Sequence, residues 1–516
     1  MPTSTRSPIE ITVDGRTVVV GDESLTLLDV LRDQVGVRSV KDGCSPQGQC
    51  GCCTVLVDGR PRVSCVTPIR RVNGRSVTTV DGLDPAVAEA WGEAFVSTGG
   101  SQCGFCTPGI ICRYEGLRSK GVSHDDRDAA TDALLAHMCR CTGWQPVVDA
   151  WVAYGSGSAA DDPDDGASRR AELEGGEAQS VGVGVGLGRG GFADDTAPPD
   201  ALVAVPAAHG DGWVVASSRA EAVREAGKVQ GRRTTAEFDP PLELPAGDWA
   251  LTLRTSWVEP AYLETDASWC EPGGVPVSPL ANGGAFGAKV ASEVGEVARR
   301  LADEHGRAVR VLYSREDAVR RGPKRPPLAA GLRSDGSGLV RVARTPGIAE
   351  AIRTVAPGLE VEEVEVVGPL TSAAIRGAGW VEASVLSAGL RGEVGWIDAP
   401  DGGSATASIG PDGALSVRVK CGLPLDETVL RSYCTGAAHM ALGMVISESL
   451  AVDPDGEIHD LTIRSFGVLR AVDTPSIDVV IEPDDGLPVN GSDAVFAAVA
   501  AAVWLQRGCP PRWPTG

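Results

Sequence analysis

Positive charge is scarce in this sequence. Its 47 Lys and Arg residues face 69 Asp and Glu residues, and the formal net charge is −22. A chain with this balance repels the phosphates of nucleic acids and the anionic headgroups of membranes. We therefore expect neither as a general partner.

Long apolar segments are also missing. The run from Ala494 to Leu505 is too short to cross a bilayer, and Met1 to Asp14 lacks the cationic and apolar stretches of a signal peptide. The sequence thus predicts a soluble, cytoplasmic protein. Histidine is rare, and the six histidines are scattered without the spacing of a metal site, so we interpret them as surface or core residues. Phosphate-loop, dinucleotide-binding and serine-nucleophile motifs are absent.

Cysteine, by contrast, is abundant, with 14 residues in a chain of 516. A chain of this length can build its cores without disulfides, and lasting disulfides are rare in a reducing compartment. The cysteines must then be metal ligands, buried small residues or reactive thiols, and their spacing distinguishes these roles. Those without close partners, which we interpret as buried apolar positions, are Cys112, Cys270, Cys421, Cys434 and Cys509.

The residue pattern divides the chain into four stretches. Residues 8–82 alternate as short strands around one helical segment, which suits a small β-grasp domain. Residues 84–153 have helical periodicity and predict an all-α domain. Residues 155–180 are rich in Gly, Ser and Asp and predict a disordered linker. Residues 181–516 mix strand-like and helical patterns, so the whole chain is expected to be of the α+β class.

Three helices are expected in this last stretch, at residues 291–304, 436–450 and 493–506, because apolar residues recur there with helical spacing. Strands are expected at residues 309–313 and 476–481, which are rich in Val and Ile. The last stretch is therefore predicted to be mixed α/β.

The first group of cysteines lies on a Gly-rich loop. Cys44, Cys50 and Cys53 have C-x5-C-x2-C spacing, and Cys65 follows after a hairpin. Three thiolates on such a loop can bind a two-iron cluster whose fourth ligand comes from the next strand, and glycines let backbone N–H groups point at the sulfurs. Zinc is the alternative, although its sites usually show paired C-x2–4-C knuckles. Cys52 breaks the spacing, and we interpret it as a packed thiol.

The second group combines two short motifs. Cys103 and Cys106 precede one helical segment, and Cys139 and Cys141 lie further along the chain. Four thiolates at two helix ends can hold a second cluster, and the helix N-terminus after Pro108 offers donors to an anionic group. Taken alone, this set could also bind zinc.

The two groups together resemble a known family. Their order, with Gln-Cys-Gly-Phe-Cys-Thr-Pro-Gly at 102–109 and Cys-Arg-Cys-Thr-Gly-Trp at 139–144, resembles the iron–sulfur subunit of the molybdenum hydroxylases, the xanthine dehydrogenase and aldehyde oxidase family. The resemblance covers residues 8–153 and implies a plant-type ferredoxin domain and a helical domain, each with one [2Fe-2S] cluster. The helical-domain cluster would be the nearer to molybdopterin. The implied ligands are Cys44, Cys50, Cys53 and Cys65 for the first cluster and Cys103, Cys106, Cys139 and Cys141 for the second.

Later fragments resemble the molybdopterin-binding subunit of the same family. Residues 283–289 resemble its glycine loop at the molybdenum centre, residues 374–379 resemble a second cofactor-facing turn, and residues 191–199 resemble its opening strand. Glycines let a backbone approach a flat anionic cofactor closely. The resemblance implies a shortened molybdopterin-binding-like region over 181–516. The implied cofactor contacts are Gly283, Gly284, Phe286, Gly287, Arg376 and Gly377.

The catalytic residue of that family does not carry over. The family has a glutamate in a Gly-x-Gly-Glu turn before a final alanine-rich helix, and the matching turn here is Asn490-Gly-Ser492-Asp493. Serine cannot accept a proton at neutral pH, and Asp493 is one residue out of register. Because a general base must first be placed correctly, we assign no catalytic residue.

Two functions follow from these expectations. In the first, the chain is an oxidoreductase component that relays electrons through two [2Fe-2S] clusters in a molybdenum hydroxylase-type system and holds molybdopterin in its last region. In the alternative, that region is a cofactor-free assembly or interaction module and the chain is an electron carrier. The expected partner is a flavin or molybdenum subunit or another redox protein, and by family analogy the substrate is a small aldehyde or N-heterocycle.

Overall fold

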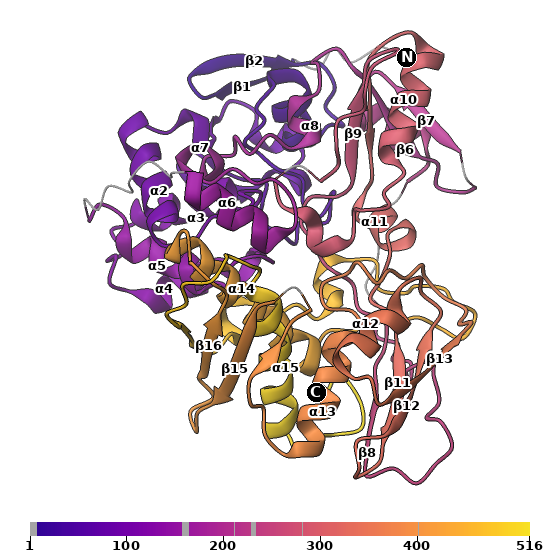
Figure 1. Ribbon diagram of the computed structural model, residues 1–516. Coiled ribbons are helices and arrows are strands. Elements are labelled where there is room, and N and C mark those ends of the chain that lie inside the picture. The colour runs from indigo at the N-terminus through magenta and orange to yellow at the C-terminus, as the bar shows by residue number, and fades with distance from the viewer. Residues whose placement is uncertain (1–7, 157–164, 211, 229–233, 281, 401) are drawn as a thin grey trace.

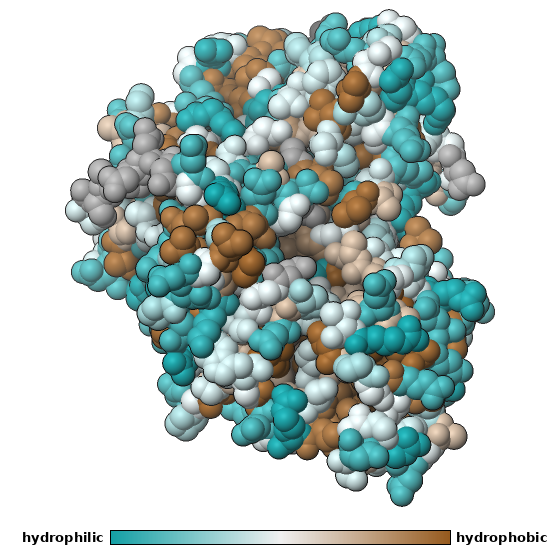
Figure 2. Space-filling model, in the orientation of Figure 1, coloured by the Kyte–Doolittle hydropathy of each residue, from teal (hydrophilic) through white to brown (hydrophobic). Residues whose placement is uncertain are grey.

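The computed structural model describes residues 8–156, 165–210, 212–228, 234–280, 282–400 and 402–516. In Figure 1 the elements up to α6 gather on one side of the molecule, and the later sheets with their helices form the rest. Figure 2 shows hydrophilic residues over much of the visible face, with hydrophobic residues in several groups. Among the described residues, no helix has both the length and the apolar character needed to cross a membrane.

The first sheet has five strands in the order β2-β1-β5-β3-β4. β1 pairs antiparallel with β2 across a tight turn at Asp14-Gly15, where both residues have positive φ, and it pairs parallel with β5. A short α-helix and a π-helix separate β2 from β3, which is the expected strand–strand–helix–strand order. The elements are β1 (Ile9–Val13), β2 (Arg16–Val20), α1 (Leu27–Asp29), η1 (Val30–Val35), β3 (Thr54–Val57), β4 (Arg60–Val63) and β5 (Ser76–Thr78).

Four helices follow, as the periodicity of residues 84–153 predicts. Asp84 caps the first, because its carboxylate accepts the Ala86 N–H at 3.0 Å. Trp91 and Trp151 are fully buried and stacked between the first and last helices. One continuous set of buried side chains runs from the first sheet into these helices, so both share a core. The helices are α2 (Pro85–Ser97), α3 (Thr107–Arg118), α4 (Arg127–Ala133) and α5 (Gln145–Ala153).

The predicted disordered linker is wrong over much of its length. Residues Asp165–Gly175 form helix α6, while residues 157–164 lie outside the described residues. Arg170 and Glu174 of α6 are buried and paired at 3.0 Å, four residues apart. Arg170 also donates to the carbonyl oxygens of Pro424 and Val489. A polar sequence can fold here because these distant groups satisfy its charges.

The described residues of the last region form three four-stranded sheets. The first, in the order β7-β6-β10-β9, contains the expected strand at residues 309–313, and the third contains the expected strand at 476–481. The strands of the first are β6 (Leu202–Pro206), β7 (Trp213–Ala216), β9 (Ala267–Cys270) and β10 (Val309–Leu312). The second sheet comprises β8 (Leu251–Arg254), β11 (Leu328–Leu332), β12 (Gly338–Ala343) and β13 (Leu359–Val364). The third comprises β14 (Ile397–Asp398), β15 (Ser404–Ile409), β16 (Leu415–Lys420) and β17 (Ile477–Ile481).

The three helices expected in this region are present as α10 (Val294–His305), α14 (Glu427–Ile446) and α15 (Ser492–Gln506). α14 begins earlier than predicted because Asp426 caps it, accepting the Val429 N–H at 2.8 Å. α15 is buried on almost every side, between α14, α13 and β15. The other helices are α7 (Val183–Gly186), α9 (Arg219–Glu225), α11 (Arg315–Arg321), α12 (Ile348–Val355) and α13 (Trp380–Arg391).

The expected opening strand at residues 191–199 is not a strand. Its centre forms a helical turn, α8 (Ala193–Thr196). Adjacent side chains of a strand point to opposite faces, whereas Asp194 and Asp195 both pair with Arg32, at 2.7 and 2.9 Å. A turn allows both carboxylates to face the same cation.

Candidate functional site

The first cysteine group occupies the loop between η1 and β3, and Cys65 joins it from a 3-10 turn after β4. Its thiols are buried and face backbone donors. Cys44 Sγ accepts N–H groups from Gln47 at 3.1 Å and Gln49 at 3.5 Å, and Cys53 Sγ accepts the Cys65 N–H at 3.5 Å. Such donors stabilise negative charge on sulfur.

The thiols of this group contact one another. Cys44 hydrogen-bonds with Cys50 and Cys65, and Cys65 also hydrogen-bonds with Cys53. Because Cys50 and Cys65 donate to it, the pKa of Cys44 lies well below the usual thiol value. The structure thus brings together all four residues that the spacing singled out.

The second group meets where two loops approach the start of α3. Cys103 Sγ lies 3.7 Å from Cys141 Sγ, and Cys106 hydrogen-bonds with Cys139. Thr142 Oγ1 lies 3.1 Å from Cys139 Sγ. The hydrogen bond from Cys106, followed by those from Thr142, lowers the pKa of Cys139 to about 6. Residues far apart in the sequence therefore form two thiol pairs.

The two groups are direct neighbours. The Met138 N–H donates to the Cys50 carbonyl oxygen at 2.9 Å, and a ring nitrogen of His137 lies 3.3 Å from the Gly109 carbonyl oxygen. A Cβ at Gly109 would lie only 2.4 Å from the Gly51 carbonyl oxygen, so glycine allows α3 to touch the first loop. Burial lowers the pKa of His137 to about 3, which keeps it neutral at pH 7.

The way in which the thiols pair indicates whether they suit a single metal ion or a two-iron cluster. Each iron of a [2Fe-2S] cluster takes two thiolates, so four cysteines bind as two pairs. Among the described residues, no three His, Cys, Asp or Glu side chains converge on the position of a single metal ion. Paired thiols with backbone donors aimed at sulfur suit a diiron cluster.

Cys52 is buried beside the first group. A Cβ at Gly43 would lie 3.1 Å from the sulfur atoms of both Cys50 and Cys52. Burial raises the pKa of Cys52, and the contact with Cys44 raises that of Cys50 as well. Protonation therefore does not separate Cys52 from the proposed ligands, and its role as a packed thiol rests on the cysteine spacing.

A cavity of about 460 Å³ adjoins the second group, and Cys103 and Cys141 form part of its wall. Four of the six residues expected to contact a cofactor also line it. These are Gly283, Phe286, Gly287 and Arg376. The structure therefore places the second thiol group and both glycine turns around one space.

The two glycine turns support each other. The Arg376 N–H donates to the Phe286 carbonyl oxygen at 3.1 Å. Gly287 has φ +84°, and a Cβ there would lie 1.8 Å from the Ala374 carbonyl oxygen, so only glycine fits. Gly284 begins the 3-10 turn η6 (Gly284–Gly287). The Gly377 carbonyl oxygen accepts from Arg325 at 2.9 Å.

The carboxylates nearest the expected catalytic turn are already engaged. Asp493 Oδ1 accepts from Arg376 Nε at 2.6 Å, and Arg376 also hydrogen-bonds with Ser492. Glu174 of α6 accepts the N–H groups of Gly491 at 3.0 Å and Ser492 at 2.9 Å, at the start of α15. Glu174 thus acts as a side-chain cap for α15.

Sequence reasoning missed the role of α6 because its residues read as a linker. The i, i+4 pair Arg170 and Glu174 was the available signal for a helix. Glu177, just after α6, also lines the cavity. No hydrogen bond or ion pair engages its carboxylate within the described part of the chain.

The second thiol group is anchored to the last region. Arg140, between Cys139 and Cys141, forms a bidentate ion pair with buried Glu448, with both N–O distances 2.6 Å. A Cβ at Gly436 of α14 would lie 1.6 Å from the Cys141 carbonyl oxygen, so the helix backbone packs directly on this loop.

The comparisons with known proteins agree with this arrangement. A family model described as "[2Fe-2S] binding domain" matches residues 79–152. The chain is 43% identical to the aldehyde oxidoreductase of Megalodesulfovibrio gigas over 146 residues, which are 27% of this chain and 16% of that protein. It is 38% identical over 149 residues to the nicotine 6-hydroxylase small subunit of Paenarthrobacter nicotinovorans, covering 28% of this chain and 88% of that subunit.

A solved structure extends the likeness of fold to nearly the whole chain. The aldehyde oxidoreductase from Desulfovibrio gigas aligns with 96% of this chain and 97% of its own, with a TM-score of 0.68 and 16% identity. At this identity the match establishes the fold.

The grouped thiols and the matched domain define an iron–sulfur protein of the oxidoreductase class. Within that class, the chain belongs to the molybdenum hydroxylase family of xanthine dehydrogenase and aldehyde oxidase.

Proposed function

We propose that this chain relays electrons through two [2Fe-2S] clusters in a molybdenum hydroxylase-type system. The observation that carries the proposal is the meeting of two neighbouring groups of four thiols, all buried except the half-buried Cys103 and Cys141, beside a large cavity. Each cluster would supply a one-electron site. The proposed ligands are Cys44, Cys50, Cys53 and Cys65 for the first cluster and Cys103, Cys106, Cys139 and Cys141 for the second.

The domain layout proposed from the sequence accompanies this function. Residues 8–82 would form a ferredoxin-like domain, residues 84–153 a helical cluster-binding domain, and residues 181–516 a molybdopterin-binding-like region. The fold shared with aldehyde oxidoreductase supports this layout. Several relatives are named as subunits, which supports a flavin or molybdenum subunit as partner.

The cavity is the proposed place for molybdopterin. Its glycine turns leave backbone atoms uncovered by side chains, which suits the close approach of a flat anionic cofactor. Bound there, the cofactor would supply hydroxylation chemistry on a small aldehyde or N-heterocycle. Because Arg376 holds Asp493 and Ser492 replaces the family's glutamate, Glu177 is the wall carboxylate that we propose to accept protons.

The alternative, a cofactor-free last region, is favoured by one observation, the loss of the family's glutamate at Ser492. Metal analysis of one anaerobically purified sample separates the possibilities. Two diiron clusters predict about four irons and four acid-labile sulfides per chain. One molybdenum per chain favours the cofactor site, iron without molybdenum favours the electron carrier, and zinc in place of iron contradicts both.

A further inference from the structure

Arg315 is a buried cation without a counter-charge. Its side chain is fully buried at the start of α11, and it donates to the carbonyl oxygens of Gly43 and Leu263, both at 2.7 Å. Its Nε and Nη1 atoms are buried and have no hydrogen-bond partner. In the described part of the chain, no carboxylate lies within ion-pair distance of this guanidinium.

Other buried arginines of this protein are neutralised. Arg140 pairs with Glu448, and Arg325 pairs with Glu382 at 2.6 Å. An unpaired buried charge costs several kcal/mol, so Arg315 needs an anion. Tyr262, whose ring centre lies 5.6 Å from the guanidinium, offers a weaker, neutral contact.

The position of Arg315 identifies the missing anion. Gly43, whose carbonyl oxygen it binds, directly precedes Cys44 in the loop of the first thiol group. A [2Fe-2S] cluster with four thiolates carries two negative charges when oxidised, because two ferric ions, two sulfides and four thiolates sum to that value, and one more when reduced. Among the described residues, Arg315 is the cationic side chain that hydrogen-bonds to Gly43. The anionic cluster would therefore lie beside Arg315.

We propose that Arg315 positions the first cluster loop and supplies the counter-charge of the first [2Fe-2S] cluster. The last region of the chain would thereby set the reduction potential of a cluster held by the first. This inference rests on the proposed function, specifically on Cys44, Cys50, Cys53 and Cys65 as ligands.

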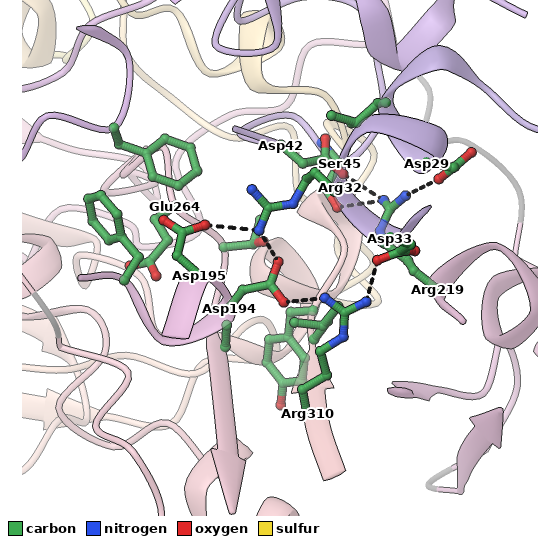
Figure 3. A pocket seen from close by; sticks show the side chains of 17 residues that line it. Asp29, Arg32, Asp33, Asp42, Ser45, Asp194, Asp195, Arg219, Glu264 and Arg310 are labelled. Atoms are coloured by element: carbon green, nitrogen blue, oxygen red, sulfur yellow. Dashed lines mark hydrogen bonds and ion pairs between the residues drawn. The ribbon is translucent and has the colours of Figure 1, made fainter. Parts of the chain in front are cut away.

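Two further arginines from the last region bind the same loop. Arg219 of α9 pairs with Asp42 at 2.7 Å and donates to Ser45 Oγ at 3.1 Å, on either side of Cys44; Figure 3 shows it between these residues and Asp29. Arg464 donates to the Gln49 carbonyl oxygen at 2.9 Å. Arginines therefore contact this loop on both sides of Cys44 and again directly before Cys50.

The electrostatic consequence has a definite sign. One-electron reduction by a chemical donor such as dithionite adds one negative charge to the cluster, and a nearby cation stabilises that charge. Removing the cation should lower the first potential. The second thiol group does not contact Arg315, so its potential should change much less.

The test compares Arg315→Met with Arg315→Lys in the full-length protein. Each cluster is followed by its electron paramagnetic resonance signal during reductive titration. We expect Arg315→Met to decrease the reduction equilibrium constant of the first cluster about tenfold, or about 59 mV for one electron. Arg315→Lys keeps the charge and should recover most of this shift.

Less buried positions supply the test if Arg315→Met does not fold. Arg464→Gln and Arg219→Gln should shift the same signal in the same direction. Arg224→Gln is the matched control for Arg219, because it lies on the same helix but forms an exposed pair with Asp22 at 3.6 Å. It should leave both potentials unchanged.

Two results would overturn the assignment. One is a folded Arg315→Met protein with full iron content and an unchanged first potential, and the other is an equal shift of both clusters. Failure of the proposed function itself is recognised separately, because the wild-type protein would then lack the iron of the first cluster before any variant is made.

Discussion

The proposed ligand cysteines all lie within the first 141 residues, whereas the cavity beside them draws its wall from segments between Gln102 and Asp493. The family model covers residues 79–152, which include the second thiol group, and one relative keeps 43% identity over 146 residues of the chain. The last region keeps the fold of aldehyde oxidoreductase at 16% identity over the whole alignment. Metal ligation depends on a few fixed side chains, while a cavity wall made of backbone tolerates changes of side chain.

Both thiol groups nevertheless depend on the last region for support. Arg315 binds the loop of the first, while Glu448 and Gly436 hold the loop of the second. The comparison is thus between the cysteines themselves and the residues of the last region that hold their loops in place. Variants of each kind can measure the two contributions separately.

The largest effect is expected from removing a ligand. Cys103→Ser should remove one of two clusters and reduce the iron content from about four to about two per chain, because the serine hydroxyl is a poor substitute for a terminal thiolate ligand of iron. Cys52→Ser is the control and should keep all the iron. Iron and sulfide analysis with paramagnetic resonance checks this, and loss of a cluster in Cys52→Ser but not in Cys53→Ser would reverse our assignment in the first loop.

The next effect tests a remote support. Glu448→Gln leaves the buried Arg140 without its carboxylate and should lower the free energy of unfolding by about 3–5 kcal/mol. Asp303→Asn, which breaks the exposed pair with Arg299, should cost far less, because solvent screens exposed pairs. Denaturant titration measures both, and similar costs for the two variants would show that the buried pair is not a support.

A smaller effect is expected from Gly436→Ala. The added Cβ would overlap the Cys141 carbonyl oxygen, and relieving this overlap should cost about 1–3 kcal/mol. The second cluster's paramagnetic signal should broaden or shift while the first stays unchanged. Gly21→Ala is the control, because an added Cβ there meets nothing within 4 Å. An unchanged free energy of unfolding in Gly436→Ala would mean that α14 does not pack tightly against the loop of Cys141.

The smallest effect concerns pH. Burial lowers the pKa of His439, on the helix that packs on this loop, to about 3, whereas an unfolded histidine has a pKa of about 6.5. Below pH 6.5 the unfolded chain binds a proton that the folded chain does not, so stability falls by up to about 1.4 kcal/mol per pH unit. His439→Leu should remove this contribution between pH 6.5 and 5.5, and exposed His209→Gln should not. Equal pH slopes in urea unfolding of wild type and His439→Leu would refute it.

The same contrast explains what the sequence could reveal. The first sheet and helices α10, α14 and α15 depend on local patterns, and these predictions match the structure. The cluster ligands also follow from local spacing and stay a prediction. Helix α6 and the turn α8 depend on contacts with residues far away in the sequence, such as those of Arg170 with the Pro424 and Val489 carbonyl oxygens, or of Asp194 with Arg32. The predictions of a linker at α6 and a strand at α8 are wrong because the residues that stabilise these segments are distant in the sequence.

The most direct test of the account is a reductive titration of the full-length protein, followed by paramagnetic resonance and spin counting. Because the two thiol groups differ in their donors and charges, two distinct signals are expected, each integrating to about one spin per chain. Cys44→Ser should abolish one signal and Cys103→Ser the other. A single signal, lost in both variants, would contradict the two-cluster relay.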